Sequence, residues 1–168
     1  MSKHLKKNTQ AFIWVGIIVV LIVAFLILPT FRNEVNKNVV AHTSSLRDDM
    51  KLVLPRGEIY VQLANTEATR ELGLSYRTSI GDDEGMLFVF DKPDNYGFWM
   101  KDMNFPIDMV WFSESGQVVH TEEDLATSSY PKVFINKPKA KYVLELNRGV
   151  ARKHGLYLGS RVDLSKVK

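Results

Sequence analysis

The sequence of 168 residues contains no cysteine. Disulfide bonds, cysteine nucleophiles, thiolate metal sites and a cysteine-linked lipid anchor are therefore excluded. The absence does not fix the compartment, because extracytoplasmic proteins of this size can fold without disulfides. The chain also lacks a phosphate-binding loop, a dinucleotide-binding glycine pattern and a Gly-x-Ser-x-Gly element. We therefore predict no cofactor, and several common classes of enzyme lack their motifs here.

Charged residues are also missing from positions 11–31, which read AFIWVGIIVVLIVAFLILPTF. The apolar core of this run spans about 26 Å as a helix, just enough to cross a bilayer. Three lysines precede it, and the positive-inside rule then places the N-terminus in the cytoplasm. A cleaved signal peptide is the alternative, but its apolar region is usually shorter and ends in a small-residue cleavage site. We therefore expect a single-pass protein of the inner, or cytoplasmic, membrane.

The expected organisation has four parts. Residues 1–10 form a basic cytoplasmic tail, and residues 11–31 form a transmembrane signal anchor. Residues 32–54 are polar and weakly periodic, which is typical of a linker. Residues 55–168 form one globular domain on the extracytoplasmic side, periplasmic or at the cell surface.

Net charge gives no support to a nucleic-acid partner. The tail accounts for the whole excess of +3, since residues 32–168 carry 19 basic and 19 acidic residues. Within the domain, acids concentrate in residues 81–131 and bases in residues 132–168. Either folding brings the two segments together and their fields cancel, or an acidic face and a basic face promote association.

Alternating patterns predict strands over most of the domain. Residues 58–63 alternate apolar and polar side chains, the period of a half-buried strand. In a second such strand, Ala140, Tyr142, Leu144 and Leu146 alternate with Lys139, Lys141, Val143 and Glu145. Residues 107–112 are apolar on both faces and should form a central strand. Further strands are expected over 86–90, 98–101, 117–121 and 161–164.

Two short helices complete the expected fold. Asn65 or Thr66 can cap a helix that runs through Leu72, and Gly73 is placed to end it. A second helix is expected over residues 150–154. These elements predict a mainly β (α+β) fold, namely a small antiparallel β-barrel or sandwich-like domain with two short helices, preceded by one N-terminal transmembrane helix.

Several short blocks of the domain occur in a recognisable order. They are RELGL at 70–74, GMLFVF at 85–90, FWMK at 98–101, PID at 106–108, YVLEL at 142–146 and LGSRV at 158–162. In this order they resemble the domain of unknown function 192 (DUF192) family over residues of about 55–165. The resemblance implies a small β-rich domain that is often exported or membrane-tethered in bacteria, and it implies no established activity.

The first candidate site lies in the block of residues 98–108. Trp99, Lys101 and Asp108 combine a large aromatic ring with opposite charges, and Arg77 flanks them. Lys101 and Asp108 could line a ligand pocket with Trp99 as a stacking wall for a sugar or ring. In the structural alternative, Lys101 and Asp108 form an ion pair that closes a loop, and Trp99 belongs to the core.

A weaker candidate is a metal site. His120, Glu122 and Asp124 are spaced by two, so a strand would place one imidazole and two carboxylates on the same face. An exposed acidic edge is the alternative, because Glu123 interrupts the pattern and the segment runs toward a loop.

Three functional hypotheses follow. The first is a membrane-tethered extracytoplasmic accessory or ligand-binding domain, without catalysis, that meets an envelope carbohydrate, peptide or protein. The second is a cell-envelope hydrolase that acts on carbohydrate or peptide, with Asp108 and a second acid such as Glu84 as general acid and base. It requires two carboxylates in one open cleft. Burial of Asp108 against Lys101 or backbone amides would instead favour binding or structure. The third is an assembly module.

Overall fold

The structure, a computed structural model, describes residues 50–167. The predicted anchor over 11–31 lies outside the described residues, as do the predicted tail and most of the linker. Between Met50 and Val167 no helix is long and apolar enough to cross a bilayer.

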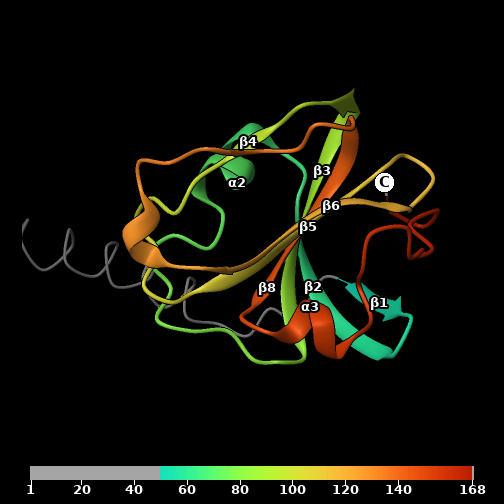
Figure 1. The fold of residues 1–168 in the computed structure, drawn as a ribbon, viewed down its shortest axis with the longest axis horizontal. Coiled ribbons are helices and arrows are strands. Elements are labelled where there is room, and N and C mark those ends of the chain that lie inside the picture. The colour runs from blue at the N-terminus through green and yellow to red at the C-terminus, as the bar shows by residue number, and fades with distance from the viewer. Residues whose placement is uncertain (1–49, 168) are drawn as a thin grey trace, which may run out of the picture. The chain divides into compact units, whose positions relative to one another are not determined.

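Six strands form the main sheet in the order β1-β2-β3-β8-β5-β6 (Figure 1). They are β1 (Met50–Leu54), β2 (Gly57–Ala64), β3 (Glu84–Asp94), β5 (Ile107–Phe112), β6 (Val118–Leu125) and β8 (Ala140–Asn147). A second, two-stranded sheet pairs β4 (Gly97–Phe98) with β7 (Phe134–Ile135). The helical elements are α2 (Glu67–Leu72), the 3-10 turn η2 (Thr127–Ser129) and α3 (Val150–Lys153).

The main sheet is open. Its outer strands are β1 and β6, and within residues 50–167 these two strands do not pair with each other. Neighbouring strands are antiparallel except β2 and β3, which run parallel and are connected through α2. The predicted mainly β fold with two short helices is therefore confirmed. Of the two predicted arrangements, barrel or sandwich-like, the barrel is wrong because the sheet is open. A barrel needs a ladder between its first and last strands, and β6 instead leads into η2 and the loop before β7.

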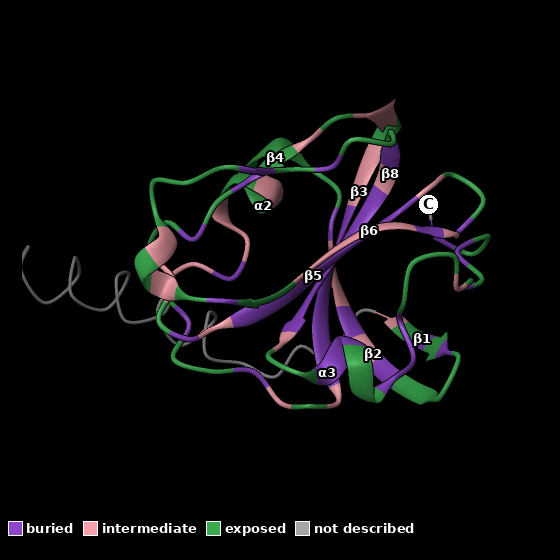
Figure 2. Cartoon of the chain, viewed as in Figure 1, coloured by how far each residue is buried: buried purple, intermediate pink, exposed green. Residues whose placement is uncertain are grey.

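Apolar side chains cover both faces of the main sheet. All six residues of β5 are buried, and the strand lies between β8 and β6, which confirms its predicted central position. Met109 and Trp111 join one core, whereas Val110 and Phe112 join the other. Figure 2 shows buried residues along β5, β8 and β3.

The two cores are covered by different elements. The α2-side core contains Leu74, which follows α2, and Phe98 of β4. The α3-side core contains Val150 of α3 and the C-terminal residues Val162 and Leu164. Because side chains alternate along β8, its residues face the two cores in turn.

Several predicted boundaries differ from the structure, among them the ends of the strands expected over 98–101 and 117–121, which are observed as Gly97–Phe98 and Val118–Leu125. β1 begins at Met50, so the sheet includes residues 50–54, which were predicted to belong to the linker. Leu52 and Leu54 of this strand are buried in the core. β3 continues through Asp94 with a register shift after Val89, beyond its predicted end. The predicted strand 161–164 is reduced to a single bridge between Gln117 and Arg161.

Candidate ligand-binding pocket

A pocket of about 390 Å³ opens on the α2 side of the sheet. It lies between α2, β3, the β4 segment and β8. Aromatic rings supply much of its wall, which includes Phe88, Phe90, Tyr96, Phe98 and Trp99. Concave sites lined by apolar side chains with a few polar groups are the usual form of small-molecule sites.

Helix α2 borders the pocket, and its sequence fixes both of its ends. The Thr66 hydroxyl accepts a hydrogen bond from the Thr69 amide at 3.2 Å, and the Thr66 amide donates to the Thr69 hydroxyl at 3.0 Å. Gly73 ends the helix at φ 52° and ψ −136°, a conformation that suits glycine. A Cβ at this position would lie 3.3 Å from Cζ of Phe88 and 3.9 Å from Oε2 of Glu145. Glycine therefore allows the chain to pass close to the pocket floor.

Glu145 lies at the floor of the pocket, in the middle of the sheet. In the ladders of β8, it pairs with Met86 of β3 on one side and with Met109 of β5 on the other. Its side chain is 4% exposed, and its Oε2 atom has no hydrogen-bond partner within residues 50–167. Burial raises the pKa of Glu145 to about 8, since an apolar environment disfavours the carboxylate.

The aromatic wall is built from ordered ring contacts. Phe90 and Tyr96 stack with ring centres 3.5 Å apart and planes at 9°, while Phe88 and Phe98 meet edge to face at 4.9 Å. Trp99 is 51% exposed and lines the outer part of the wall. Most of the wall is therefore held by packing before any ligand enters.

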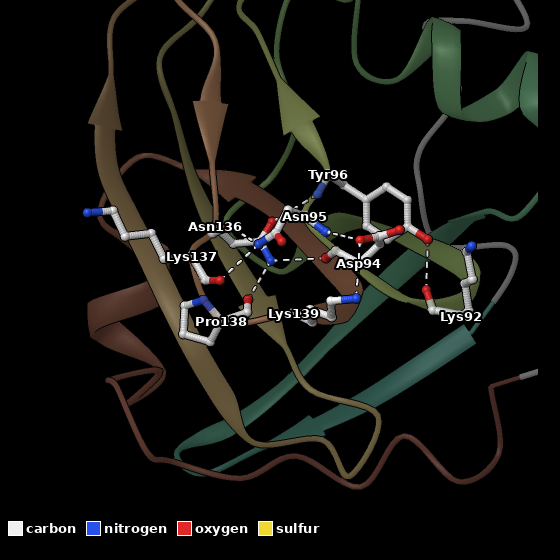
Figure 3. Close-up of polar contacts among 8 residues, drawn as sticks. All are labelled: Lys92, Asp94, Asn95, Tyr96, Asn136, Lys137, Pro138 and Lys139. Atoms are coloured by element: carbon white, nitrogen blue, oxygen red, sulfur yellow. Dashed lines mark hydrogen bonds and ion pairs between the residues drawn. The ribbon is translucent and has the colours of Figure 1, made fainter.

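A buried asparagine holds the Tyr96 part of the wall (Figure 3). Asn136 is fully buried, and its Oδ1 accepts a hydrogen bond from the Tyr96 amide at 3.1 Å. Its Nδ2 donates to the carbonyl of Asp94 at 3.2 Å and to that of Pro138 at 2.6 Å. The Tyr96 hydroxyl donates to the Lys92 carbonyl at 2.7 Å. The bonds of Asn136 tie the end of β3 to the segment between β7 and β8, and the Tyr96–Lys92 bond fixes the Tyr96 ring at the end of β3.

Charged groups in the pocket are mostly acidic. Glu67 and Glu71 of α2 line it together with Glu145, and Arg70 is the one basic residue that residues 50–167 contribute to its lining. The guanidinium of Arg70 donates to the Val89 carbonyl at 2.9 Å and lies 5.3 Å from the centre of the Phe90 ring. The arginine is thus already engaged with the protein, although its positive charge remains in the pocket lining.

The structure places the four predicted ligand-binding residues in different environments. Trp99 lines the pocket, and together with Lys101 it also lines an adjoining hollow of about 400 Å³. Arg77 is buried; it donates to the Gln62 side chain at 2.8 Å, and its carbonyl accepts from Asn104 at 2.9 Å. Burial lowers the pKa of Arg77, and the charge of Glu84 partly offsets this effect.

Asp108 lies apart from the pocket and connects three elements. It is fully buried on β5, its Oδ1 accepts from the Asp124 amide at 3.0 Å, and its Oδ2 accepts from the Ala151 amide of α3 at 3.1 Å. Burial raises the pKa of Asp108, while its bonds to backbone amides lower it. The Lys101–Asp108 ion pair of the sequence analysis is not formed. Asp108 holds α3 and the end of β6 against β5.

The three predicted metal ligands do not converge. Nε2 of His120 and Oε1 of Glu122 are 3.3 Å apart, but Asp124 has a φ of 55° and pairs with Arg148 at 3.4 Å. Within the described part of the chain, no group of three or more histidine, aspartate and glutamate side chains could hold a metal ion. The positive φ turns Asp124 away from the strand alternation on which the prediction rested.

Sequence reasoning missed Glu145 as a site residue. The alternation along residues 139–146 assigned it to a polar face with Lys139 and Lys141. The residue in the sequence that could have indicated burial of this face is the apolar Val143, which shares the face with Glu145 and is buried in the structure. A strand that is apolar on both faces is a central strand, so a single acid within it is expected to be buried.

Comparisons with known proteins agree with the fold. The family model for DUF192, described as an uncharacterised ACR family, matches residues 52–164. A solved structure of a "putative transcription regulator" from Sinorhizobium meliloti is 31% identical, with a TM-score of 0.62 over 67% of this chain and 89% of that chain. A protein of unknown function from Novosphingobium aromaticivorans is 28% identical, with a TM-score of 0.60 over 67% of this chain and 81% of that one. No curated protein matches the chain.

Proposed function

The chain belongs to the DUF192 family, and we propose that its domain binds a small ligand in the Glu145 pocket without catalysing a reaction. One observation carries the proposal: among the described residues, Oε2 of Glu145 has no hydrogen-bond partner, and it lies at the floor of a pocket lined by aromatic rings. A buried polar atom without a hydrogen bond costs free energy. A ligand that donates a hydrogen bond to Oε2 would remove this cost. Ligand binding would therefore explain why a polar atom is buried here.

The enzyme alternative with Asp108 and Glu84 receives no support from their positions. Asp108 accepts hydrogen bonds from backbone amides, and Glu84 accepts one from the Gly81 amide at 3.0 Å. Neither residue is among those that line the pocket. Burial of Asp108 against amides is the arrangement that favours binding or structure over acid–base catalysis.

We further propose that the pocket operates outside the cytoplasm, on a domain tethered to the inner membrane by residues 11–31. The support is the sequence itself: an uncharged apolar run follows three lysines. In this location the ligand would be a small molecule of the cell envelope, or a group on an envelope carbohydrate, peptide or protein. The balanced charge of residues 32–168 does not support nucleic acid as the partner.

The binding proposal can be tested on the full chain in detergent micelles. Thermal unfolding is followed with benzylamine, benzyl alcohol, N-acetylglucosamine and a dialanine peptide as probes. We expect at least one probe to raise the midpoint saturably, because a ligand that binds only the folded state stabilises it. The increase should be lost in Trp99→Ala, which opens the pocket wall.

Tyr157→Ala is the matched control, since this exposed aromatic residue is not among the pocket-lining residues. It should respond to the probe as the unmodified protein does. If none of the four probes shifts the midpoint, or if Trp99→Ala responds normally, the binding proposal is wrong.

A further inference from the structure

We propose that the pocket accepts a small organic ammonium ion that keeps at least one N–H and carries a flat apolar group. This inference rests on the proposed function, because it requires that the pocket binds a ligand. It adds the charge and the shape of that ligand.

The floor of the pocket supplies the acceptor for the N–H. Glu145 lies between Met86 and Met109 on the sheet, so its strand neighbours offer no donor side chain. Its Oε2 atom is buried without a hydrogen-bond partner in the described domain. Hydrogen bonds from an ammonium to a carboxylate are shorter and stronger than those between neutral groups. An N–H of the ligand would therefore complete the one unsatisfied acceptor at the floor.

The wall suits both the charge and a flat group. Aromatic rings attract cations, most strongly where water is excluded. The protein already uses one ring of this wall in that way, since the Arg70 guanidinium lies 5.3 Å from the Phe90 ring centre. Trp99 is half exposed at the wall, where its ring could stack on a flat substituent.

The charges around Glu145 favour a cation over an anion. Glu67 and Glu71 line the same pocket, so among the described residues of its lining these two acids outnumber the single base, Arg70, which donates to the Val89 carbonyl. Tyr96 is the remaining titratable group of the lining. Because burial raises the pKa of Glu145 to about 8, the empty pocket holds this acid largely protonated at neutral pH. An ammonium ion stabilises the carboxylate, so its binding should release a proton and strengthen as the pH rises.

The test compares three benzyl probes by calorimetric titration of the full chain in detergent. Benzylamine offers charge and N–H, benzyltrimethylammonium offers charge without N–H, and benzyl alcohol is neutral. We expect benzylamine to bind at least about tenfold more tightly than either of the others, since a charged hydrogen bond at a buried site has roughly that effect. Its affinity should rise at least about tenfold between pH 6 and pH 8, as Glu145 loses its proton.

Variants separate the floor from the wall. Glu145→Gln should weaken benzylamine at least about tenfold and leave benzyl alcohol unchanged. Glu58→Gln is the matched control, because this exposed residue of β2 pairs with Lys51 and does not line the pocket. If Glu145→Gln fails to fold, the pH profile of the unmodified protein decides the question.

The outcomes distinguish this inference from the proposed function. Benzyl alcohol binding as tightly as benzylamine, a flat pH profile, or no effect of Glu145→Gln would overturn the ammonium inference and leave a ligand pocket in place. Equal binding of benzyltrimethylammonium would overturn the requirement for an N–H. If none of the three probes binds, the ammonium inference fails, and the broader probe set decides the binding proposal.

Discussion

The buried carboxyl of Glu145, whose Oε2 atom has no hydrogen-bond partner within residues 50–167, makes the stability of the domain depend on pH. Burial raises its pKa from the ordinary 4.5 to about 8, so the folded state holds a proton that the unfolded state releases between these values. The contribution of Glu145 to the free energy of unfolding is therefore fully present below about pH 4.5 and is lost as the pH rises through 8. We predict that Glu145→Gln, which keeps the shape without the charge, is more stable than the unmodified protein at pH 8.5.

The expected difference is on the order of 2–5 kcal/mol at pH 8.5 and falls toward zero near pH 5. Urea unfolding at both pH values, followed by near-UV circular dichroism, measures it. The pKa of Asp108 is also raised by burial, but Asp108 is present in both proteins and cancels from the comparison. An equal gain in stability at both pH values would contradict the assignment.

Gly73 is a second position where one side chain decides the geometry of the pocket. Gly73→Ala should destabilise the domain by about 1–3 kcal/mol, because alanine is strained at φ 52° and ψ −136°. The added Cβ would also press on Phe88 at 3.3 Å and weaken benzylamine binding. Gly149→Ala is the control: φ there is 81°, but a Cβ would meet nothing within 4 Å. Gly149→Ala should lower stability without weakening benzylamine binding. Unchanged benzylamine binding in Gly73→Ala would show that the end of α2 does not shape the pocket.

At the scale of elements, Asn136 joins the end of β3 to the chain between β7 and β8. Asn136→Ala removes three hydrogen bonds and leaves the Tyr96 amide and two carbonyls without their partner. We predict a loss of about 1–3 kcal/mol in the free energy of unfolding, together with weaker benzylamine binding, because the stacked Tyr96 and Phe90 rings lose their support. Denaturation and titration measure the two effects.

Lys139→Ala is the matched control for this junction, since Lys139 is exposed and its ion pair with Asp94 is long, at 3.7 Å. Exposed pairs of this kind contribute at most about 1 kcal/mol. Lys139→Ala should therefore leave both stability and binding nearly unchanged. A similar loss in both variants would mean that the charges, and not the buried amide, hold the wall.

Asp108 joins β5, β6 and α3 and belongs to the opposite side of the sheet. Asp108→Ala leaves the amides of Asp124 and Ala151 without their acceptor, and it should destabilise the domain by about 2–4 kcal/mol. Because Asp108 does not line the pocket, benzylamine affinity measured below the unfolding transition should be unchanged. A selective loss of affinity at unchanged stability would return Asp108 to the ligand site.

Local patterns predicted elements better than they predicted the site. The cap at Thr66, the stop at Gly73 and the double apolar face of β5 each depend on neighbouring residues, and the structure confirms them. The insertion of β8 between β3 and β5 depends on pairing between distant segments. Only this insertion places Glu145 between two methionines and leaves its carboxyl buried. Trp99 was predicted as wall or core, and its half-exposed position against the pocket is likewise set by tertiary contacts.

At the scale of the described domain, folding interleaves the charges that are segregated along the sequence. Bases of the segment 132–168 pair with acids of the segment 81–131. The pairs are Arg152 with Glu123 at 2.7 Å, Lys141 with Glu114 at 2.7 Å, Arg148 with Asp124 at 3.4 Å, Lys153 with Asp82 at 3.6 Å and Lys139 with Asp94 at 3.7 Å. Each pair lies at the surface and contributes little stability. Their combined effect is to offset the two fields locally, which removes the main argument for an assembly module with one acidic and one basic face.

A balanced domain has no electrostatic reason to remain at an anionic membrane, so its location should depend on residues 11–31 alone. We predict that the full chain expressed in bacteria stays in the membrane pellet after an alkaline wash, because an intact transmembrane helix resists extraction. A chain with Val19 and Val20 both replaced by arginine should leave the pellet, since each charge at the centre of a span costs about 2.5–3.5 kcal/mol on insertion scales. Replacement of the two valines by leucine is the matched control and should behave as the unmodified chain does.

Externally added protease should degrade the domain in spheroplasts but not in intact, sealed inverted vesicles. Release of the unmodified chain by the alkaline wash, or protection of the domain in spheroplasts, would show that the proposed tether or its orientation is wrong.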